Sequence, residues 1–244
     1  MRKLLRNRDL VMITASLLGD AVVDLVSAGE ETRRRRYFAP LIVGPSKTSG
    51  LNRSINRLLK TGELERVIKG GQPYLRLTDS GKGTFYRDFP LFRFQGRKWD
   101  GYWVVVSYDI PEKRRYLREY LSDKLQKLGF GMWQKSVYIS PHDFGEDVRE
   151  WLIFNDLTDY VSVSKSKELA PDEKKLAEQV FNLDLLEEVY SDILSRISQL
   201  KGEAIPESIR NEYLQLLLTD PFLPTELLPV GWSELKIRKA LLPK

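Results

Sequence analysis

Residues 46–77 read SKTSGLNRSINRLLKTGELERVIKGGQPYLRL, and this stretch decides the fold of the N-terminal region. The spacing of its apolar residues predicts a helix over residues 47–60, with Ser46 as the N-cap and Gly62 just after the end. The apolar side chains predicted to face inward are Leu51, Ile55, Leu58 and Leu59. The polar side chains that face outward or flank this stripe are Asn52, Arg53, Asn56, Arg57 and Lys60.

Two short strand-like segments follow, at residues 64–68 and 74–77, with Lys-Gly-Gly-Gln between them at residues 69–72. A glycine pair between two such segments predicts a β-hairpin. A turn, a helix with outward Asn and Arg residues and a basic hairpin are typical of a winged helix-turn-helix. We therefore expect this fold in the N-terminal region.

Upstream of this stretch the sequence is less regular. Residues 8–28 have the apolar spacing of a helix, whereas Pro40 interrupts residues 37–43, so we place no second helix directly before the turn. Four consecutive arginines, Arg33, Arg34, Arg35 and Arg36, fit either contact with phosphates or a solvated basic loop.

The charges are unevenly distributed along the chain. Residues 1–98 carry 20 Lys and Arg against 9 Asp and Glu, which gives +11, and the remaining residues carry 19 against 25, which gives −6, so the sum is the net +5. A basic N-terminal part favours a polyanionic partner, here double-stranded DNA. An uneven but inert surface is the alternative.

The residue types of the predicted helix suit DNA. Arginine can donate two hydrogen bonds to a guanine edge, and asparagine can match adenine. The residues predicted to approach bases are therefore Asn52, Arg53, Asn56 and Arg57. Those predicted to hold phosphates, which add affinity without sequence choice, are Lys47, Lys60, Arg66 and Lys69.

The composition, 42% hydrophobic and 30% charged, is that of an ordinary globular protein. The absence of cysteine excludes disulfides and thiolate metal sites. No apolar run approaches the length of about 18 residues that a membrane span needs, and the N-terminus lacks the features of a signal peptide. We expect a cytoplasmic protein without a bound cofactor.

Three regions are predicted within an α+β protein: residues 1–98, 99–168 and 169–244. In the central region the strands are expected at residues 102–108, 133–140 and 159–164, and the helices at 113–128 and 143–155. With one further strand this order is the ferredoxin-like β-α-β-β-α-β arrangement. The last region is helical in pattern, with amphipathic segments over residues 172–200 and 207–218.

Several motifs resemble those of PaaX-type transcriptional regulators. The central ones are WDGYW (99–103), SYDIPEKRR (107–115), LGFG (128–131) and QKSVYISP (134–141). Flanking ones are NRLLKTG (56–62) and LRLTDSG (75–81) before them, and FNLD (181–184) and DPFLPTELLPVGW (220–232) after them. Together they span most of the chain in the order of the family.

This resemblance implies a DNA-binding regulator, a dimeric repressor, whose central domain is similar to the small ferredoxin-like subunit of the CRISPR adaptation machinery. Family members named for phenylacetate breakdown are repressors that an aryl-coenzyme A thioester releases. No motif identifies a pocket for such a small-molecule effector here, so the effector stays open.

Asp109 raises the alternative of a metal-dependent nuclease or CRISPR-adaptation protein. In the CRISPR subunits an aspartate at the end of the first strand is proposed to hold a divalent metal across a dimer interface, and Asp109 matches that place. A simpler interpretation is that Asp109 caps the helix behind Ile110 and Pro111. No second motif supports hydrolysis, so we expect a protein that is not an enzyme.

Other candidate residues have structural interpretations. His142 is the only histidine, which excludes a histidine-based triad or metal cluster, and we expect it to be an incidental surface residue. Trp99, Tyr102 and Trp103 could stack on bases, but packing in a core or interface is the commoner role.

The amphipathic C-terminal helices need burial within the chain or against a second copy. Because helix-turn-helix proteins commonly bind two half-sites, a homodimer is expected. A non-enzymatic scaffold that uses the acidic part for protein contacts is a further alternative.

Overall fold

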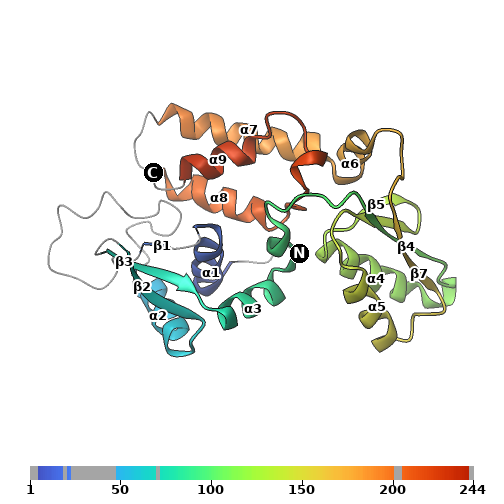
Figure 1. Ribbon diagram of the computed structural model, residues 1–244, viewed down its shortest axis with the longest axis horizontal. Coiled ribbons are helices and arrows are strands. Elements are labelled where there is room, and N and C mark those ends of the chain that lie inside the picture. The colour runs from blue at the N-terminus through green and yellow to red at the C-terminus, as the bar shows by residue number, and fades with distance from the viewer. Residues whose placement is uncertain (1–4, 19–20, 23–47, 70–71, 201–204, 242–244) are drawn as a thin grey trace. The chain divides into compact units, whose positions relative to one another are not determined.

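The computed structural model of the chain describes residues 5–18, 21–22, 48–69, 72–200 and 205–241 (Figure 1). It is an α+β structure with two β-sheets in these described residues, as predicted. Its contacts define two compact units. Unit 1 comprises Met1–Phe89, Glu188–Thr219 and Ser233–Lys244, and unit 2 comprises Pro90–Glu187 and Asp220–Trp232. The three regions predicted along the chain, with boundaries at residues 98 and 168, stay a prediction.

The N-terminal part of unit 1 combines three helices with a small sheet. Its elements are α1 (Asn7–Leu18), β1 (Ala21–Val22), α2 (Thr48–Lys60), β2 (Leu64–Lys69), β3 (Gln72–Leu77) and α3 (Asp79–Asp88). The strands pair antiparallel in the order β1-β3-β2, and α1 packs against α2 and β3. The predicted helix at residues 47–60 and the predicted hairpin are confirmed.

The first predicted helix, over residues 8–28, is wrong in its length. α1 ends at Leu18, and Ala21 and Val22 pair with Leu75 and Tyr74 of β3 instead of continuing the helix. In the sequence the residue after Leu18 is glycine, a residue type that favours helix ends.

The C-terminal part of unit 1 is helical. It contains α7 (Leu183–Gln199) from Glu188 onward, α8 (Glu207–Leu217) and α9 (Ser233–Leu241). Tyr190 of α7 lies against Tyr213 of α8, with ring centroids 6.4 Å apart. The Tyr213 hydroxyl donates to Glu234 of α9 at 2.9 Å, and Arg238 donates to the same carboxylate. Among the described residues, no helix is both long and apolar enough to cross a membrane.

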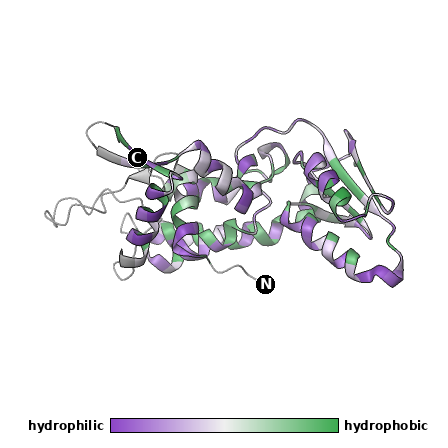
Figure 2. Cartoon of the chain, turned by 90° about the horizontal axis from the view of Figure 1, so that it is seen from below, coloured by the Kyte–Doolittle hydropathy of each residue, from purple (hydrophilic) through white to green (hydrophobic). Residues whose placement is uncertain are grey.

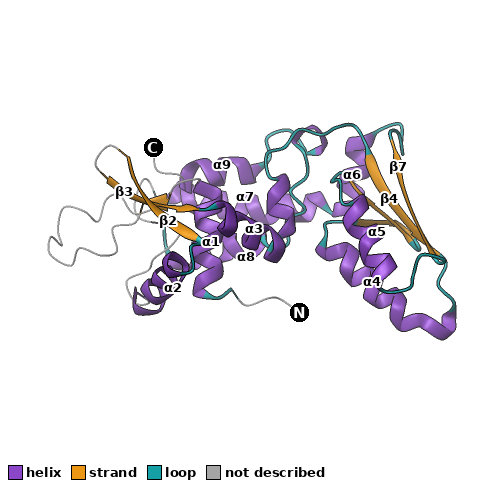
Figure 3. Ribbon diagram, turned by 60° about the horizontal axis from the view of Figure 1, so that its bottom comes forward, coloured by secondary structure: helices purple, strands orange, loops and turns teal. Residues whose placement is uncertain are grey.

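Unit 2 has a four-stranded antiparallel sheet, with α4 and α5 lying along one of its faces (Figure 3). Its elements are η1 (Pro90–Phe94), β4 (Trp103–Tyr108), η2 (Glu112–Arg114), α4 (Arg115–Lys127), β5 (Gly131–Gln134), β6 (Val137–Ser140), α5 (Gly145–Phe154), β7 (Val161–Ser166), α6 (Glu173–Phe181) and η3 (Thr225–Leu227). The strand order is β5-β6-β4-β7, so β4 is an interior strand. The order β-α-β-β-α-β predicted for the central region is present.

Packing in unit 2 follows from its sequence pattern. β4 is an apolar, β-branched run that appears as a hydrophobic stretch in the sheet (Figure 2). The core of the unit combines one face of this strand with the inner sides of α4 and α5: Val104, Val106, Leu121, Leu125, Tyr138, Phe144, Val148 and Leu152 are all buried. Burial of each such side chain contributes about 1.5–3 kcal/mol.

The single strand predicted over residues 133–140 is wrong. The structure divides it into β5 and β6, an antiparallel pair with an irregular register between Met132 and Gln134. Ser136 has a φ of 65°, a left-handed conformation that reverses the chain between the two strands. This hairpin supplies the further strand that the ferredoxin-like arrangement requires.

Candidate nucleic-acid interface

α2 presents one polar side to the solvent because its apolar stripe is buried. Leu51, Ile55 and Leu58 lie in the core, at the spacing of one helical face. The side chains of Arg53, Asn56, Arg57 and Lys60 are exposed, as predicted, and Asn52 is half-buried. Leu59, predicted to face inward, is half-buried as well. The outward side of α2 therefore carries three cationic groups and one exposed amide.

The end of α2 is fixed to the strands and helix that follow. Gly62 adopts a φ of 75°, and the amide of Glu63 donates to the carbonyl of Leu58 at 3.0 Å. The Thr78 hydroxyl donates to the carbonyl of Gly62 at 2.6 Å and accepts a hydrogen bond from the amide of Gly81 at 3.0 Å. Thr78 thus caps α3 and holds the base of the hairpin against the end of α2.

The hairpin of β2 and β3, which we call the ribbon, carries charge along its length. Arg66 is exposed and lies opposite Leu75, whereas Arg76 lies opposite Glu65, with 3.9 Å between their charged groups. Ile68, two residues from Arg66 and so on the same side of the strand, is 77% exposed. Sequence reasoning missed this apolar side chain, although an isoleucine beside a glycine turn was a visible signal.

Arg8 of α1 is a cation of a different kind. Its guanidinium lies 2.8 Å from Asp88 and 3.3 Å from Glu63, so it joins α1 to α3 and to the turn after α2. Burial lowers the pKa of Arg8, but hydrogen bonds and attraction from the two carboxylates outweigh this effect, and the net shift is upward. Arg8 therefore stabilises unit 1.

The exposed cationic side chains of α2 and the ribbon differ from Arg8 in whether a carboxylate pairs with them. Within the part of the chain that the structure describes, no carboxylate pairs with Arg53, Arg57, Lys60 or Arg66. Other residues predicted for phosphate contact, Lys47 and Arg33, Arg34, Arg35 and Arg36, lie outside the described residues, as does the side chain of Lys69.

Asp109 does not cap a helix, so that interpretation is wrong. The residue before η2 is Pro111, and no side chain caps η2 or α4. The Asp109 side chain is exposed, and its amide donates to the carbonyl of Tyr160 at 2.9 Å. Over the described ranges, no group of three or more His, Asp or Glu side chains is arranged to hold a metal ion.

His142 is buried, so the prediction of an incidental surface residue is wrong. Its Nε2 lies 2.7 Å from the carbonyl oxygen of Pro221, and its ring stacks on Phe94 with centroids 4.4 Å apart. Burial lowers the pKa of His142 to about 4, helped by Arg93 and Arg97 and opposed by the hydrogen bond to Pro221. The imidazole is therefore neutral near pH 7.

The aromatic residues that open the central region have packing roles. Trp103 is buried, and its indole nitrogen donates to Glu173 at 2.8 Å. Trp99 packs edge-on against Trp103, with centroids 5.6 Å apart, and Tyr102 is partly exposed. These contacts favour packing over base stacking for Trp103.

The chain is similar in sequence and in fold to known proteins. Residues 96–178 match the family model described as the PaaX protein central Cas2-like domain. The chain is also similar to the transcriptional repressor PaaX of Escherichia coli (strain K12), with 25% identity over 199 residues, or 72% of this chain. The resemblance of the chain to PaaX-type regulators is therefore confirmed. It spans 61% of the length of that repressor.

A solved structure shares the fold of this chain. The uncharacterized protein Rv0674 from Mycobacterium tuberculosis superposes with a TM-score of 0.54 and 22% sequence identity, over 95% of this chain and 92% of that one. At this identity the likeness shows the fold alone.

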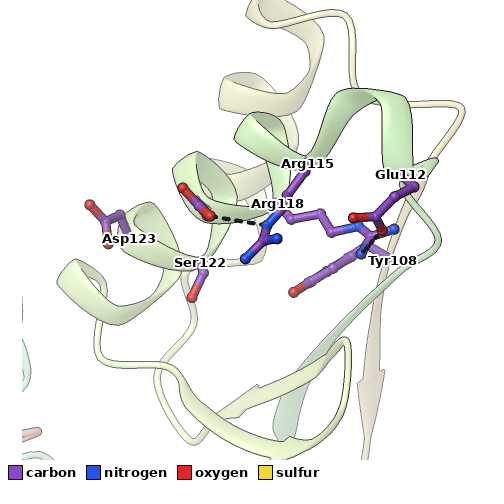
Figure 4. Close-up of a pocket in the computed structure, with 7 residues that line it drawn as sticks. Tyr108, Glu112, Arg115, Arg118, Ser122 and Asp123 are labelled. Carbon is purple, nitrogen blue, oxygen red and sulfur yellow. Dashed lines mark ion pairs between the residues drawn. The ribbon is translucent and has the colours of Figure 1, made fainter.

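In unit 2, α4 borders a cleft of about 490 Å³ (Figure 4). Its lining includes two arginines against three carboxylates: Arg115, Arg118, Glu112, Glu119 and Asp123. Arg118 lies 3.0 Å from Glu112, and Arg115 lies 3.4 Å from Glu119. Because both arginines are already paired, the cleft presents no unpaired guanidinium to an anionic effector.

Proposed function

We propose that this PaaX-type chain is a sequence-specific DNA-binding transcriptional regulator, acting as a repressor. In this proposal the N-terminal part of unit 1 is a winged helix-turn-helix, with α2 as the recognition helix and the ribbon as the wing. The second helix of such a fold is not assigned, and residues 23–47, which precede α2, lie outside the described residues.

One observation carries the proposal: the solvent-facing side of α2 joins Arg53, Asn56 and Arg57 on a helix whose other side is in the core. These side chains can hydrogen-bond base edges in a major groove, which admits a helix. The exposed Arg66 on the adjacent ribbon adds a cation suited to phosphates. Similarity to a protein named as a transcriptional repressor supports the same function.

Selection of bound duplexes from a random DNA pool tests the proposal directly, because the operator sequence need not be known. We expect one enriched motif, with an affinity that falls steeply as salt concentration rises. Recovery of a random mixture, or no retained DNA at low salt, would refute the function.

Substitutions of single cationic residues then distinguish side chains that contact bases from side chains that contact phosphates. Arg53→Ala is expected to cost about 1–3 kcal/mol on the selected site, to relax one base position and to change binding to random DNA little. Lys60→Ala on the same helix, or Lys69→Ala on the ribbon, is expected to weaken all sequences alike. If Arg53→Ala weakened binding to selected and to random DNA equally, Arg53 would not be a base-contacting residue.

A cleavage assay with Mg²⁺ or Mn²⁺ addresses the nuclease alternative. Metal-dependent cutting that Asp109→Asn abolishes would favour that alternative over the regulator. Under the proposed function, both the wild type and the variant leave the duplex intact.

A further inference from the structure

The two faces of the ribbon differ in chemistry. Residues that lie opposite one another in an antiparallel pair share a face. One face carries, from β2 and then from the opposite positions of β3, Leu64, Arg66, Ile68, Leu77, Leu75 and Pro73. The other face carries Glu65 and Arg76, whose charged groups lie 3.9 Å apart. Along the described strands, the face with Ile68 therefore has a cation and no carboxylate.

The face with Ile68 passes from the core to the solvent along its length. Leu64, Leu75 and Leu77 are buried, and α2 packs against β2 while α1 packs against β3, so this is the face that the helices cover. Nearer the tip, Arg66 is exposed and Ile68 is 77% exposed. Ile68 therefore projects from the sheet on the side where α2 lies (Figure 1). Within the described N-terminal part of unit 1, no other large apolar side chain is exposed.

The length of the ribbon suits the spacing of grooves in a DNA duplex. A strand rises about 3.3 Å per residue, so Ile68 lies about 13 Å along β2 from Leu64 at the base of the ribbon. One turn of B-DNA spans about 34 Å, so the centre of a minor groove lies about 17 Å from that of the adjacent major groove. If α2 occupies a major groove, the side chain of Ile68 comes within reach of the adjacent minor groove.

An isoleucine side chain in a minor groove favours A·T pairs over G·C pairs. The amino group of guanine projects into this groove as a hydrogen-bond donor, and an isoleucine that covers it offers no acceptor. A·T pairs lack this amino group. Steps such as TA are also deformed easily by an inserted apolar side chain.

We propose that Ile68 is a minor-groove contact that makes the chain select A·T pairs about half a helical turn from the bases that α2 contacts. Arg66, on the same face and two residues nearer the base of the ribbon, contacts a phosphate at the edge of this groove. The inference rests on the proposed function, since it assumes that α2 occupies the major groove. It adds a specificity-determining residue that has no hydrogen-bonding side chain.

The test uses the full-length chain and the duplex selected from the random pool. The base pairs about five positions from the centre of the selected motif, which we call the flank, are made A·T, G·C or inosine·cytosine. Inosine lacks the amino group of guanine but presents the same acceptors in the major groove. We expect the G·C flank to weaken binding about tenfold and the inosine flank to restore it, as measured by fluorescence anisotropy. An inosine flank that binds as weakly as the G·C flank would overturn the proposal.

Ile68→Ser tests the assignment to this residue. Because the side chain is exposed, its loss opens no cavity in the core. We expect the variant to bind the A·T and G·C flanks with equal affinity. The matched control is Val67→Ser, which changes a half-buried aliphatic side chain on the other face of the same strand and is expected to keep the tenfold discrimination. Discrimination that survives Ile68→Ser, or that both substitutions abolish, would contradict the role of Ile68.

The outcomes distinguish this inference from the proposed function. A wild type that selects one motif but binds all three flanks equally would remain a sequence-specific regulator, and the minor-groove role of Ile68 would be wrong. A wild type that selects no motif would refute both.

Discussion

The hydroxyl of Thr78 donates a hydrogen bond to the carbonyl oxygen of Gly62 at 2.6 Å, although the residues are 16 positions apart in sequence. The hydroxyl oxygen also accepts from the Gly81 amide at 3.0 Å. One side chain therefore satisfies a carbonyl at the end of α2 and an amide at the start of α3. Thr78 thereby links the base of the ribbon to the end of α2.

Thr78→Val keeps the shape of the side chain but removes both hydrogen bonds. We expect the free energy of unfolding to fall by about 1–2 kcal/mol, the typical contribution of a helix cap. Urea denaturation followed by circular dichroism measures the change. The control is Ser80→Ala, which removes an exposed hydroxyl on the same helix; a loss of equal size there would contradict the role of Thr78.

Gly81 and Gly83 of α3 offer a second matched pair. A Cβ atom at Gly81 would lie 1.9 Å from the carbonyl oxygen of Glu63, whereas nothing lies within 4 Å of one at Gly83. Gly81→Ala is therefore expected to destabilise the protein by about 3 kcal/mol or more, and Gly83→Ala to stabilise it by about 0.5–1 kcal/mol. Urea denaturation measures both changes. If the denaturation midpoints of the two variants shifted in the same direction, this geometry would be contradicted.

The ribbon allows a prediction about salt dependence. If Arg66 neutralises a phosphate, Arg66→Ala weakens binding to all DNA sequences and reduces the slope of log K against log salt concentration by about 0.9. Fluorescence anisotropy over a salt series measures both effects. Arg76→Ala is the control, since Arg76 faces Glu65 across the strands and is expected to change the slope less. An unchanged slope for Arg66→Ala would exclude phosphate contact.

The sequence correctly predicted those elements for which the spacing of apolar residues and the turn residues indicate the same structure. The helix ending at Lys60, the hairpin after it and the apolar run of β4 are examples, because each is encoded within a few adjacent residues. The exposed face of α2 followed from the same period. Its half-buried Asn52 did not, since the packing of a flanking residue depends on the neighbouring elements.

Long-range contacts explain the predictions that failed. His142 is buried because Pro221, 79 residues later, supplies its hydrogen-bond acceptor and Phe94 covers its ring. The β5–β6 hairpin turns at Ser136, a residue type that does not usually mark a left-handed conformation. The helix predicted to continue to residue 28 ends early, and Ala21 and Val22 complete the sheet that β3 provides.

His142 gives the protein a predicted sensitivity to acid. Its pKa is about 4 in the folded chain and 6.5 for the ordinary group, so below pH 6.5 the unfolded chain binds a proton that the folded chain does not. The stability contributed by the neutral imidazole is therefore complete above pH 6.5 and is lost as the pH falls towards 4, by about 3 kcal/mol in all.

Urea denaturation at pH 7 and pH 5 measures this loss. His142→Gln keeps a side-chain donor for Pro221 but has no group that titrates in this range, so we expect its stability to fall less between the two pH values than that of the wild type. An identical fall in both proteins would contradict the assignment of the pH dependence to His142.

The position of β4 between β6 and β7 also governs how the protein can be made. During synthesis β4 leaves the ribosome before either of its neighbours, and its second edge stays open until Val161–Ser166 has followed. A nascent chain therefore exposes the run Val104, Val105 and Val106 with unpaired backbone groups for the whole of that interval. Truncations that end before Val161 would be prone to aggregate, and chaperone demand would be greatest at that stage of translation.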